Sequence, residues 1–139
     1  MKVAIHQAVG ESKKFIEKNF DASKALASIF DIFSKANKYI EVTEPYRLAK
    51  DETKSKRLDT VLRNLLESIR IGTILMSAFL PDCSKKVLDA LHVQNRMYND
   101  TREFYNLKEN DEVDELGILF PRIDLDKEFA ELAEIMGEN

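Results

Sequence analysis

Residues 36–50 read ANKYIEVTEPYRLAK and hold the most informative pattern in the chain. They predict the end of one amphipathic helix, a short turn and a second helix that begins at Pro45. Proline is favoured in a helix's first turn because its ring presets φ and its absent N–H would lack a partner there anyway. Tyr46 and Arg47 then stand at the entrance of the second helix, with Lys50 one turn further on. A flat ring beside cations suits an unstacked nucleotide, since the ring can stack on a base and the cations can meet phosphates.

The sequence before this stretch has the spacing of buried helices. From residue 26 to residue 40 the apolar side chains recur at intervals of three, four and seven, as on one stripe of a helix. Asp21 or Ser23 could cap the start of that helix. An earlier helix is predicted over residues 3–19, although its apolar positions are more loosely spaced.

A third long helix is predicted over residues 56–80, where the apolar side chains form a broad face. Gly72 lies in its middle, and glycine costs about 1 kcal/mol relative to alanine there, so we expect close packing against a neighbouring helix. Pro81 should stop this helix. Ser84 or Asp82 could then cap a shorter one.

The last third of the chain has weaker patterning. From residue 92 to residue 115 periodicity fades and polar residues dominate, so we expect a long connection with one helical turn at residues 101–105. Residues 116–123 form an extended apolar segment. Asp124 should cap a last helix, and Gly137 lies just past its end.

Together these elements predict an all-α, up-and-down antiparallel helical bundle. We divide the chain into the bundle at residues 1–92, a polar connection at residues 93–115, and a C-terminal segment with its helix at residues 116–139. We expect the C-terminal segment and helix to pack on the bundle.

The composition is that of one soluble domain. The 139 residues include only four glycines and three prolines, which favours long helices over a strand-rich fold. The single Cys83 cannot form an internal disulfide and fits a reducing cytoplasm, which is the location we expect. No secretory signal is visible, and the longest apolar run, residues 71–80, is half of the ~20 residues that a membrane span requires.

The net charge of −4 conceals two regions of opposite sign. Residues 1–108 hold 19 Lys and Arg against 14 Asp and Glu, a net charge of +5. Residues 109–139 hold 2 against 11, a net charge of −9. A mildly basic body with a separate acidic segment is compatible with an RNA partner.

Several blocks of sequence carry a family resemblance. NKYI at residues 37–40 and EPYRLAK at residues 44–50 resemble the helical anticodon-binding domain of methionyl-tRNA synthetase, a class I enzyme. Further matches are Val61-Leu62, Leu66-Glu67, Ile69-Arg70, Phe79-Leu80-Pro81 and the block LFPRID at residues 119–124. Matched blocks in the family's order over about residues 20–124 are more specific than a lone motif. The resemblance implies a role in protein biosynthesis and methionine tRNA, through its anticodon stem-loop, as a partner.

The resemblance also implies site residues. Tyr46 stands where the family usually has tryptophan and would stack on an anticodon base; with a smaller ring, stacking should survive and weaken. The alternative is a tyrosine that packs on the preceding helix with its hydroxyl in water. Arg47, Lys50 and Arg57 would meet phosphates, or else form a solvated face; Tyr46, Lys50 and Arg57 would share one face if the helix from Pro45 stays regular. Asn37, which the family also carries, would orient neighbouring backbone.

No catalytic apparatus is visible in the sequence. Residues 53–56 (TKSK) superficially match the lysine-serine loop of class I synthetases, but they lie in the anticodon region, and no His-Ile-Gly-His element exists. Asp89 and His92 have the spacing of one metal-ligand pair, without the second pair that a di-iron site needs. We therefore expect no metal or cofactor in this chain and no enzyme activity from it alone; ATP and methionine would bind a catalytic domain.

The resemblance stops at the N-terminus. Residues 1–19 are similar to the second helix of the family's domain, and the Asn-Leu-x-x-Arg string of the first helix does not precede them. We expect the C-terminal part of a synthetase, cut or encoded within its anticodon-binding domain. Its protein partner would be the catalytic domain, or another chain that fills the groove left by the first helix. The alternative function is a non-catalytic module for protein interaction or dimerisation.

Overall fold

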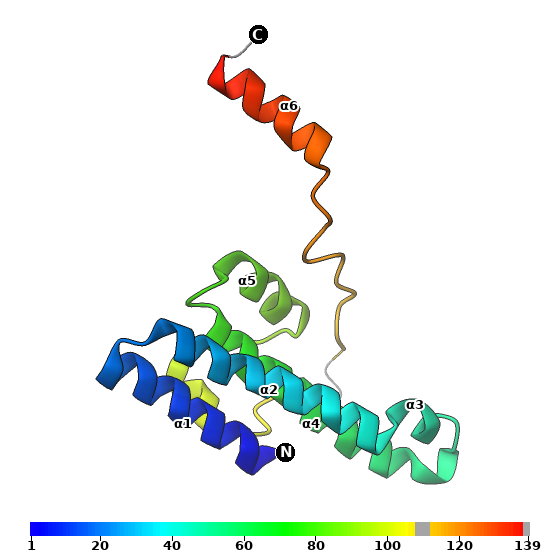
Figure 1. Cartoon of the computed structure of the whole chain (residues 1–139). Coiled ribbons are helices and arrows are strands. Elements are labelled where there is room, and N and C mark those ends of the chain that lie inside the picture. Colours follow the sequence, from blue (N-terminus) through cyan, green and yellow to red (C-terminus); the bar gives the residue numbers. More distant parts are fainter. Residues whose placement is uncertain (108–111, 138–139) are drawn as a thin grey trace.

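The computed structural model describes residues 1–107 and 112–137, which form helices joined by turns and extended segments (Figure 1). No strand occurs in these ranges, so the predicted all-α class is confirmed. The α-helices are α1 (Lys2–Asn19), α2 (Ala22–Thr43), α3 (Pro45–Leu48), α4 (Ser55–Met76), α5 (Pro81–Ala90) and α6 (Leu125–Met136); the 3-10 helices are η1 (Glu52–Lys54) and η2 (Tyr98–Arg102).

The core lies where α1, α2 and α4 meet. Figure 1 shows these three long helices side by side, with α5 against the C-terminal half of α4 and α3 at the opposite end. Each helix contributes apolar side chains at helical spacing, so burial of the three stripes against one another stabilises the bundle. The buried cluster comprises Ile5, Ala8, Val9, Ile29, Ile32, Ile71, Leu75, Met76 and Phe104.

Gly72 lies at a close approach between α4 and α2, as its position in the sequence predicts. A Cβ atom built at Gly72 would lie 2.8 Å from Cζ of Phe33, which is closer than carbon atoms normally approach. The absent side chain therefore makes room for the Phe33 ring.

Three of the predicted helix ends are confirmed. The Asp21 carboxylate accepts a hydrogen bond from the Lys24 N–H (2.9 Å) at the start of α2. Asp124 likewise accepts one from the Lys127 N–H (3.4 Å) at the start of α6. Gly137 ends α6 in the left-handed conformation, with φ of 69°, which costs glycine little.

The junction between α4 and α5 differs from the prediction. The helix α4 ends at Met76, before Pro81, and Pro81 is instead the first residue of α5. Neither Ser84 nor Asp82 caps α5, because Leu80 holds the N-cap position and its carbonyl accepts the Ser84 N–H (3.0 Å). Proline carries no N–H, so this helix start has one fewer donor for a side chain to satisfy.

The connection after α5 packs on the bundle more closely than its polar sequence indicates. Its 3-10 helix η2 begins at Tyr98, earlier than the predicted turn at residues 101–105. Tyr98 and Phe104 pack against the core, and Thr101 is fully buried. Residues 98–104 of the connection are therefore part of the folded unit.

The C-terminal helix corrects one expectation. The chain places α6 away from the bundle rather than on it (Figure 1), and the large apolar side chains of α6 are exposed. The segment before α6 runs extended and touches the bundle near its beginning, where the Asp114 N–H donates to the Ala90 carbonyl (3.0 Å). Among the described residues, no helix in the chain has both the length and the apolar character needed to cross a membrane.

Candidate nucleic-acid interface

The junction between α2 and α3 is shaped by Pro45. The proline ring disfavours the helical conformation of the residue before it, so α2 cannot run on through Glu44. Glu44 takes the left-handed conformation, with φ of 44° and ψ of 58°, and its N–H still donates to the Ile40 carbonyl (2.9 Å). The Thr43 hydroxyl donates to the Tyr39 carbonyl (2.6 Å). Both bonds satisfy carbonyls at the end of α2 and fix the angle at which α3 leaves it.

Leu48 anchors the short helix α3 to the bundle, packing against a buried cluster of α2 and α4. Tyr46 and Arg47 lie on the solvent side of α3. Tyr46 is 57% exposed, and the Arg47 side chain is 70% exposed. The Tyr46 ring is therefore accessible, which favours the stacking interpretation over a ring packed on α2. The cluster under Leu48 comprises Ala36, Val61 and Leu65.

One carboxylate contacts both exposed side chains. The Tyr46 hydroxyl donates to Oε1 of Glu44 (3.1 Å), and Nη1 of Arg47 lies 3.0 Å from Oε2 of the same residue. Glu44 was not among the site residues predicted from the sequence. Its position two and three residues before the tyrosine and the arginine is the signal that could have done so.

The helix that begins at Pro45 does not continue to Lys50 and Arg57. The helix ends at Leu48, and Asp51 then caps η1 by accepting from the Thr53 N–H (3.1 Å). The premise that Tyr46, Lys50 and Arg57 share one face of a continuous helix is therefore wrong. Both cations are nevertheless exposed on neighbouring segments of the same end of the bundle.

The Asp51 carboxylate caps the turn between α3 and α4 and is ionised. Lys54 Nζ lies 2.9 Å from one carboxylate oxygen, and the Thr53 hydroxyl donates to the other at 2.6 Å. These hydrogen bonds, the one from Lys54 foremost, lower the pKa of Asp51 to about 2. Asp51 is therefore charged at neutral pH and keeps these hydrogen bonds in the turn that follows Lys50.

Asn37 does not orient backbone as expected. It is exposed on α2, and its side chain forms no hydrogen bond with the described residues. Asn64 of α4 has that bridging role: its Nδ2 donates to the Tyr39 hydroxyl (3.1 Å), and its Oδ1 accepts from the Tyr105 hydroxyl (2.8 Å). Asn64 thereby ties α2 and the connection to the middle of α4. Sequence spacing could not reveal a bridge between residues so far apart in the chain.

Tyr105 contacts both another aromatic ring and two cations. Its ring packs edge-on against Phe104, with 4.8 Å between ring centroids. Lys2 Nζ and Arg63 Cζ each lie 6.0 Å from the Tyr105 ring centroid. Two cations therefore already contact the Tyr105 ring, whereas no cation–ring contact is seen at Tyr46 among the described residues.

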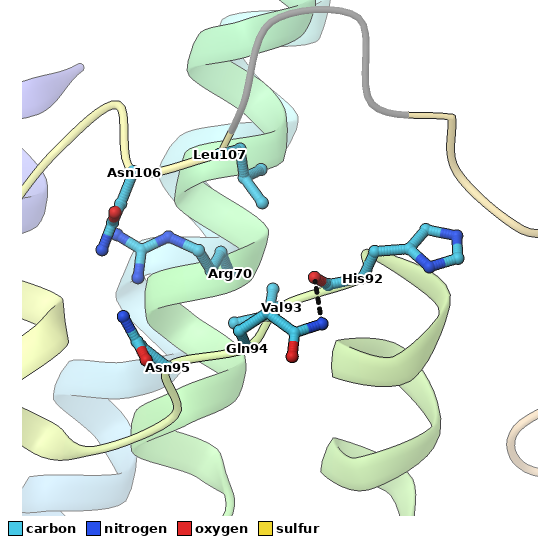
Figure 2. Close-up of a pocket in the computed structure, with 7 residues that line it drawn as sticks. All are labelled: Arg70, His92, Val93, Gln94, Asn95, Asn106 and Leu107. Atoms are coloured by element: carbon cyan, nitrogen blue, oxygen red, sulfur yellow. Dashed lines mark hydrogen bonds between the residues drawn. The ribbon is translucent and has the colours of Figure 1, made fainter.

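A hollow of about 270 Å³ lies between α4 and the connection (Figure 2). Figure 2 shows the side chains of Asn95 and Asn106 pointing toward Arg70, while the His92 ring points away. Arg70 is 1% exposed and already donates to the Glu67 carboxylate and to the carbonyls of the connection. The hollow therefore presents no uncommitted cation, and its arrangement is structural.

An apolar groove of about 350 Å³ lies between α1, α2 and the C-terminal end of α4. Its lining includes Ile16, Ile29, Leu75, Phe79 and Met97.

The pair considered for metal binding has other partners. Asp89 accepts from Lys85 (2.8 Å) and Arg96 (2.7 Å), and both hydrogen bonds, that from Lys85 first, lower the pKa of the Asp89 carboxyl. His92 Nε2 lies 3.2 Å from the Asp114 carboxylate. The described part of the chain holds no group of three or more side chains suited to ligating a metal ion.

Comparison with known proteins agrees with the resemblance seen in the sequence. Residues 2–137 match the family described as the anticodon binding domain of methionyl tRNA ligase. The methionine–tRNA ligase of Clostridium perfringens is 42% identical over 120 residues, which cover 84% of this chain and 19% of that protein.

Two further relatives have the same name. The methionine–tRNA ligase of Caldanaerobacter subterraneus is 47% identical over 111 residues, 79% of this chain and 17% of that protein. The one from Clostridium acetobutylicum is 36% identical over 136 residues, 96% of this chain and 21% of that protein. The chain therefore spans about a fifth of the length of these relatives. It belongs to the family of methionyl-tRNA ligase anticodon-binding domains.

Proposed function

We propose that this chain is the tRNA-recognition portion of a methionine–tRNA ligase. It binds the anticodon stem-loop of methionine tRNA and so positions the tRNA for aminoacylation at a catalytic domain. The observation that carries the proposal is the exposed Tyr46 ring beside Arg47 at the α2–α3 junction, in a chain of the anticodon-binding family.

In this proposal Tyr46 and its neighbouring cations have different roles. The ring stacks on an unpaired anticodon base, an interaction worth about 1–3 kcal/mol on other aromatic platforms. Arg47, Lys50 and Arg57 are exposed at the same end of the bundle and meet phosphates, which adds affinity without reading sequence. Stacking therefore requires an unpaired base but accepts any of the four, and the cations make the binding sensitive to salt.

The test measures the affinity of the chain for a fluorescently labelled anticodon stem-loop of methionine tRNA, by anisotropy at low and moderate salt. Tyr46→Ala should weaken binding by about five- to 150-fold, the range that the stacking energy implies. Tyr46→Phe keeps the ring but loses the hydroxyl contact with Glu44, so it should weaken binding much less than Tyr46→Ala. Equal affinities of the wild-type and Tyr46→Ala proteins would remove Tyr46 from the interface.

Phe20 offers a matched control for the loss of an exposed ring. It is 90% exposed and lies in the turn between α1 and α2. The 22 residues of α2 separate that turn from α3 by about 33 Å, at 1.5 Å per residue. Phe20→Ala should leave RNA affinity unchanged. A loss equal to that of Tyr46→Ala would mean that any exposed ring contributes non-specifically.

A second function, association with another polypeptide, is favoured by α6. Its Leu125, Phe129, Leu132 and Met136 recur at helical spacing and are all at least half exposed. Such an apolar stripe is a typical surface for helix docking. Sedimentation equilibrium of the full chain tests self-association: a monomer at all concentrations would leave only a different partner for this surface.

A further inference from the structure

The two residues that the proposed function places against RNA are both in contact with Glu44. One oxygen of its carboxylate accepts the Tyr46 hydroxyl (3.1 Å), and the other lies 3.0 Å from Arg47 Nη1. The tyrosine contact is a neutral donor on a charged acceptor, whereas the arginine contact is an ion pair. Glu44 therefore has two separable effects: it orients the ring, and it neutralises the guanidinium.

The backbone keeps Glu44 near its two partners. Glu44 lies in the left-handed conformation immediately before Pro45, and its own carbonyl accepts the N–H groups of Arg47 (2.8 Å) and Leu48 (3.2 Å). Its side chain is 35% exposed, against 70% for Arg47. The carboxylate is thus the more fixed member of the ion pair.

Arg47 differs in this respect from the other cations of the interface. Lys50 and Arg57 form no ion pair within the described part of the chain, so a phosphate can approach them without displacing a protein carboxylate. A phosphate that approaches Arg47 must displace Glu44 or accept repulsion from it. Exposed ion pairs contribute only about 0–1 kcal/mol, so RNA can displace Glu44 but loses part of the contact energy in doing so.

We propose that Glu44 acts as an internal competitor of RNA phosphate at Arg47, while its other oxygen orients the Tyr46 ring for stacking. The inference rests on the proposed function. Glu44 lowers the affinity of the junction for any polyanion and leaves base stacking as the main requirement for binding. It is therefore a positioning residue of the RNA interface that also weakens the contact between Arg47 and phosphate.

Glu44→Gln separates the two effects, because the amide oxygen can still accept from the Tyr46 hydroxyl while the charge is lost. Affinity for the methionine stem-loop should rise about two- to fivefold, the equivalent of one exposed ion pair. The plot of log affinity against log salt should steepen by about 0.7, the value for one more neutralised phosphate of a single strand. A stem-loop from another tRNA should gain by the same factor, since phosphate contacts carry no sequence information.

A double-mutant cycle assigns the gain to Arg47. Arg47→Ala should weaken binding at least twice as much in the Glu44→Gln background as in the wild type, because the competitor is then absent. Arg57→Ala is the matched control, and it should weaken binding by the same factor in both backgrounds. Equal effects of Arg47→Ala in the two backgrounds would overturn the assignment.

The two proposals fail in different ways. If Tyr46→Ala weakens RNA binding but Glu44→Gln binds no more tightly than wild type, the competitor role is wrong and the proposed function stands. If Tyr46→Ala has no effect, Tyr46 is not part of the RNA interface. The competition between Glu44 and phosphate for Arg47 is then tested by titrating the Nε–Hε resonance of Arg47 with inorganic phosphate. That resonance should respond at lower phosphate concentration in Glu44→Gln; equal responses would refute the competitor role.

Discussion

At the residue scale, Gly72 shows how one absent side chain sets the distance between two helices. In α4 the substitution Gly72→Ala would raise helix propensity by about 1 kcal/mol. The added Cβ would lie 2.8 Å from Phe33, however, and overpacking a core typically costs about 1–3 kcal/mol. We expect the steric term to win, because Phe33 is packed against the buried cluster. Gly72→Ala should therefore lower the free energy of unfolding by about 1 kcal/mol, measured by urea denaturation.

Gly10 is the matched control for this prediction. It lies within α1, and a Cβ atom there would meet nothing within 4 Å. Gly10→Ala should raise the free energy of unfolding by up to about 1 kcal/mol through helix propensity alone. The steric account is wrong if both substitutions stabilise the chain equally.

The sequence predicted the role of single residues well where that role depends on contacts with residues nearby in the chain. Asp21, Asp124 and Gly137 end their helices by contacts within a few residues, and the sequence rules for such ends held. The prediction for Ser84 or Asp82 failed because Pro81 already provides a helix start. Glu44 could be connected to Tyr46 and Arg47 only once the turn at Pro45 had a definite conformation.

At the element scale, a buried ion pair fastens the connection to α4. Arg70 and Glu67 are each 1% exposed and lie 2.9 Å apart. Arg70 also donates to the carbonyls of Asp100 (3.1 Å) and Glu103 (2.7 Å), while Glu67 accepts the Leu107 N–H (2.7 Å). The pair thus satisfies backbone groups that would otherwise be buried without partners.

Arg70→Ala should destabilise the chain strongly. It would leave Glu67 buried without its counterion and free the carbonyls of the connection, a change that typically costs about 3–5 kcal/mol. Urea denaturation measures the loss. The control is Lys85→Ala, which breaks an exposed ion pair with Asp89 (2.8 Å) and should cost at most about 1 kcal/mol. Similar losses for the two variants would show that the buried pair does not hold the connection.

The long helices were predictable and the connection was not, for one physical reason. The stripes of α1, α2 and α4 repeat every three or four residues, so they can be seen in the sequence. The connection is held by side chains of α4 that bind backbone about 30 to 40 residues away. Hydrogen bonds between such distant residues produce no periodic pattern in the sequence. The same limit applies to α3, a four-residue helix whose Leu48 packs against distant residues of α2 and α4.

At the scale of the whole molecule, the chain consists of a bundle with its connection and a separate C-terminal helix. The charge division seen in the sequence follows these parts: the basic residues lie mainly in the bundle, and the acidic excess lies in the C-terminal part. The helix α6 carries an apolar stripe, but it does not pack on the bundle as we expected from the sequence. Periodicity predicts that a helix has a buried face, but it does not identify the surface that covers it.

The separation of α6 predicts effects of very different size for two phenylalanines. Phe129 on α6 is 65% exposed, whereas Phe104 in the connection is 8% exposed and belongs to the core cluster. Phe129→Ala should change the free energy of unfolding by less than about 0.5 kcal/mol, as surface substitutions do. Phe104→Ala should lower it by about 3–5 kcal/mol, since it leaves a cavity beside α1 and α4.

Thermal and urea unfolding at two protein concentrations measure both effects. Concentration matters because any association through α6 would stabilise the folded chain by mass action. If the protein is a monomer in which α6 does not pack on the bundle, the Phe129→Ala and wild-type proteins should have the same free energy of unfolding at both concentrations. A loss of more than about 2 kcal/mol on Phe129→Ala at the lower concentration would mean that α6 packs on its own bundle after all.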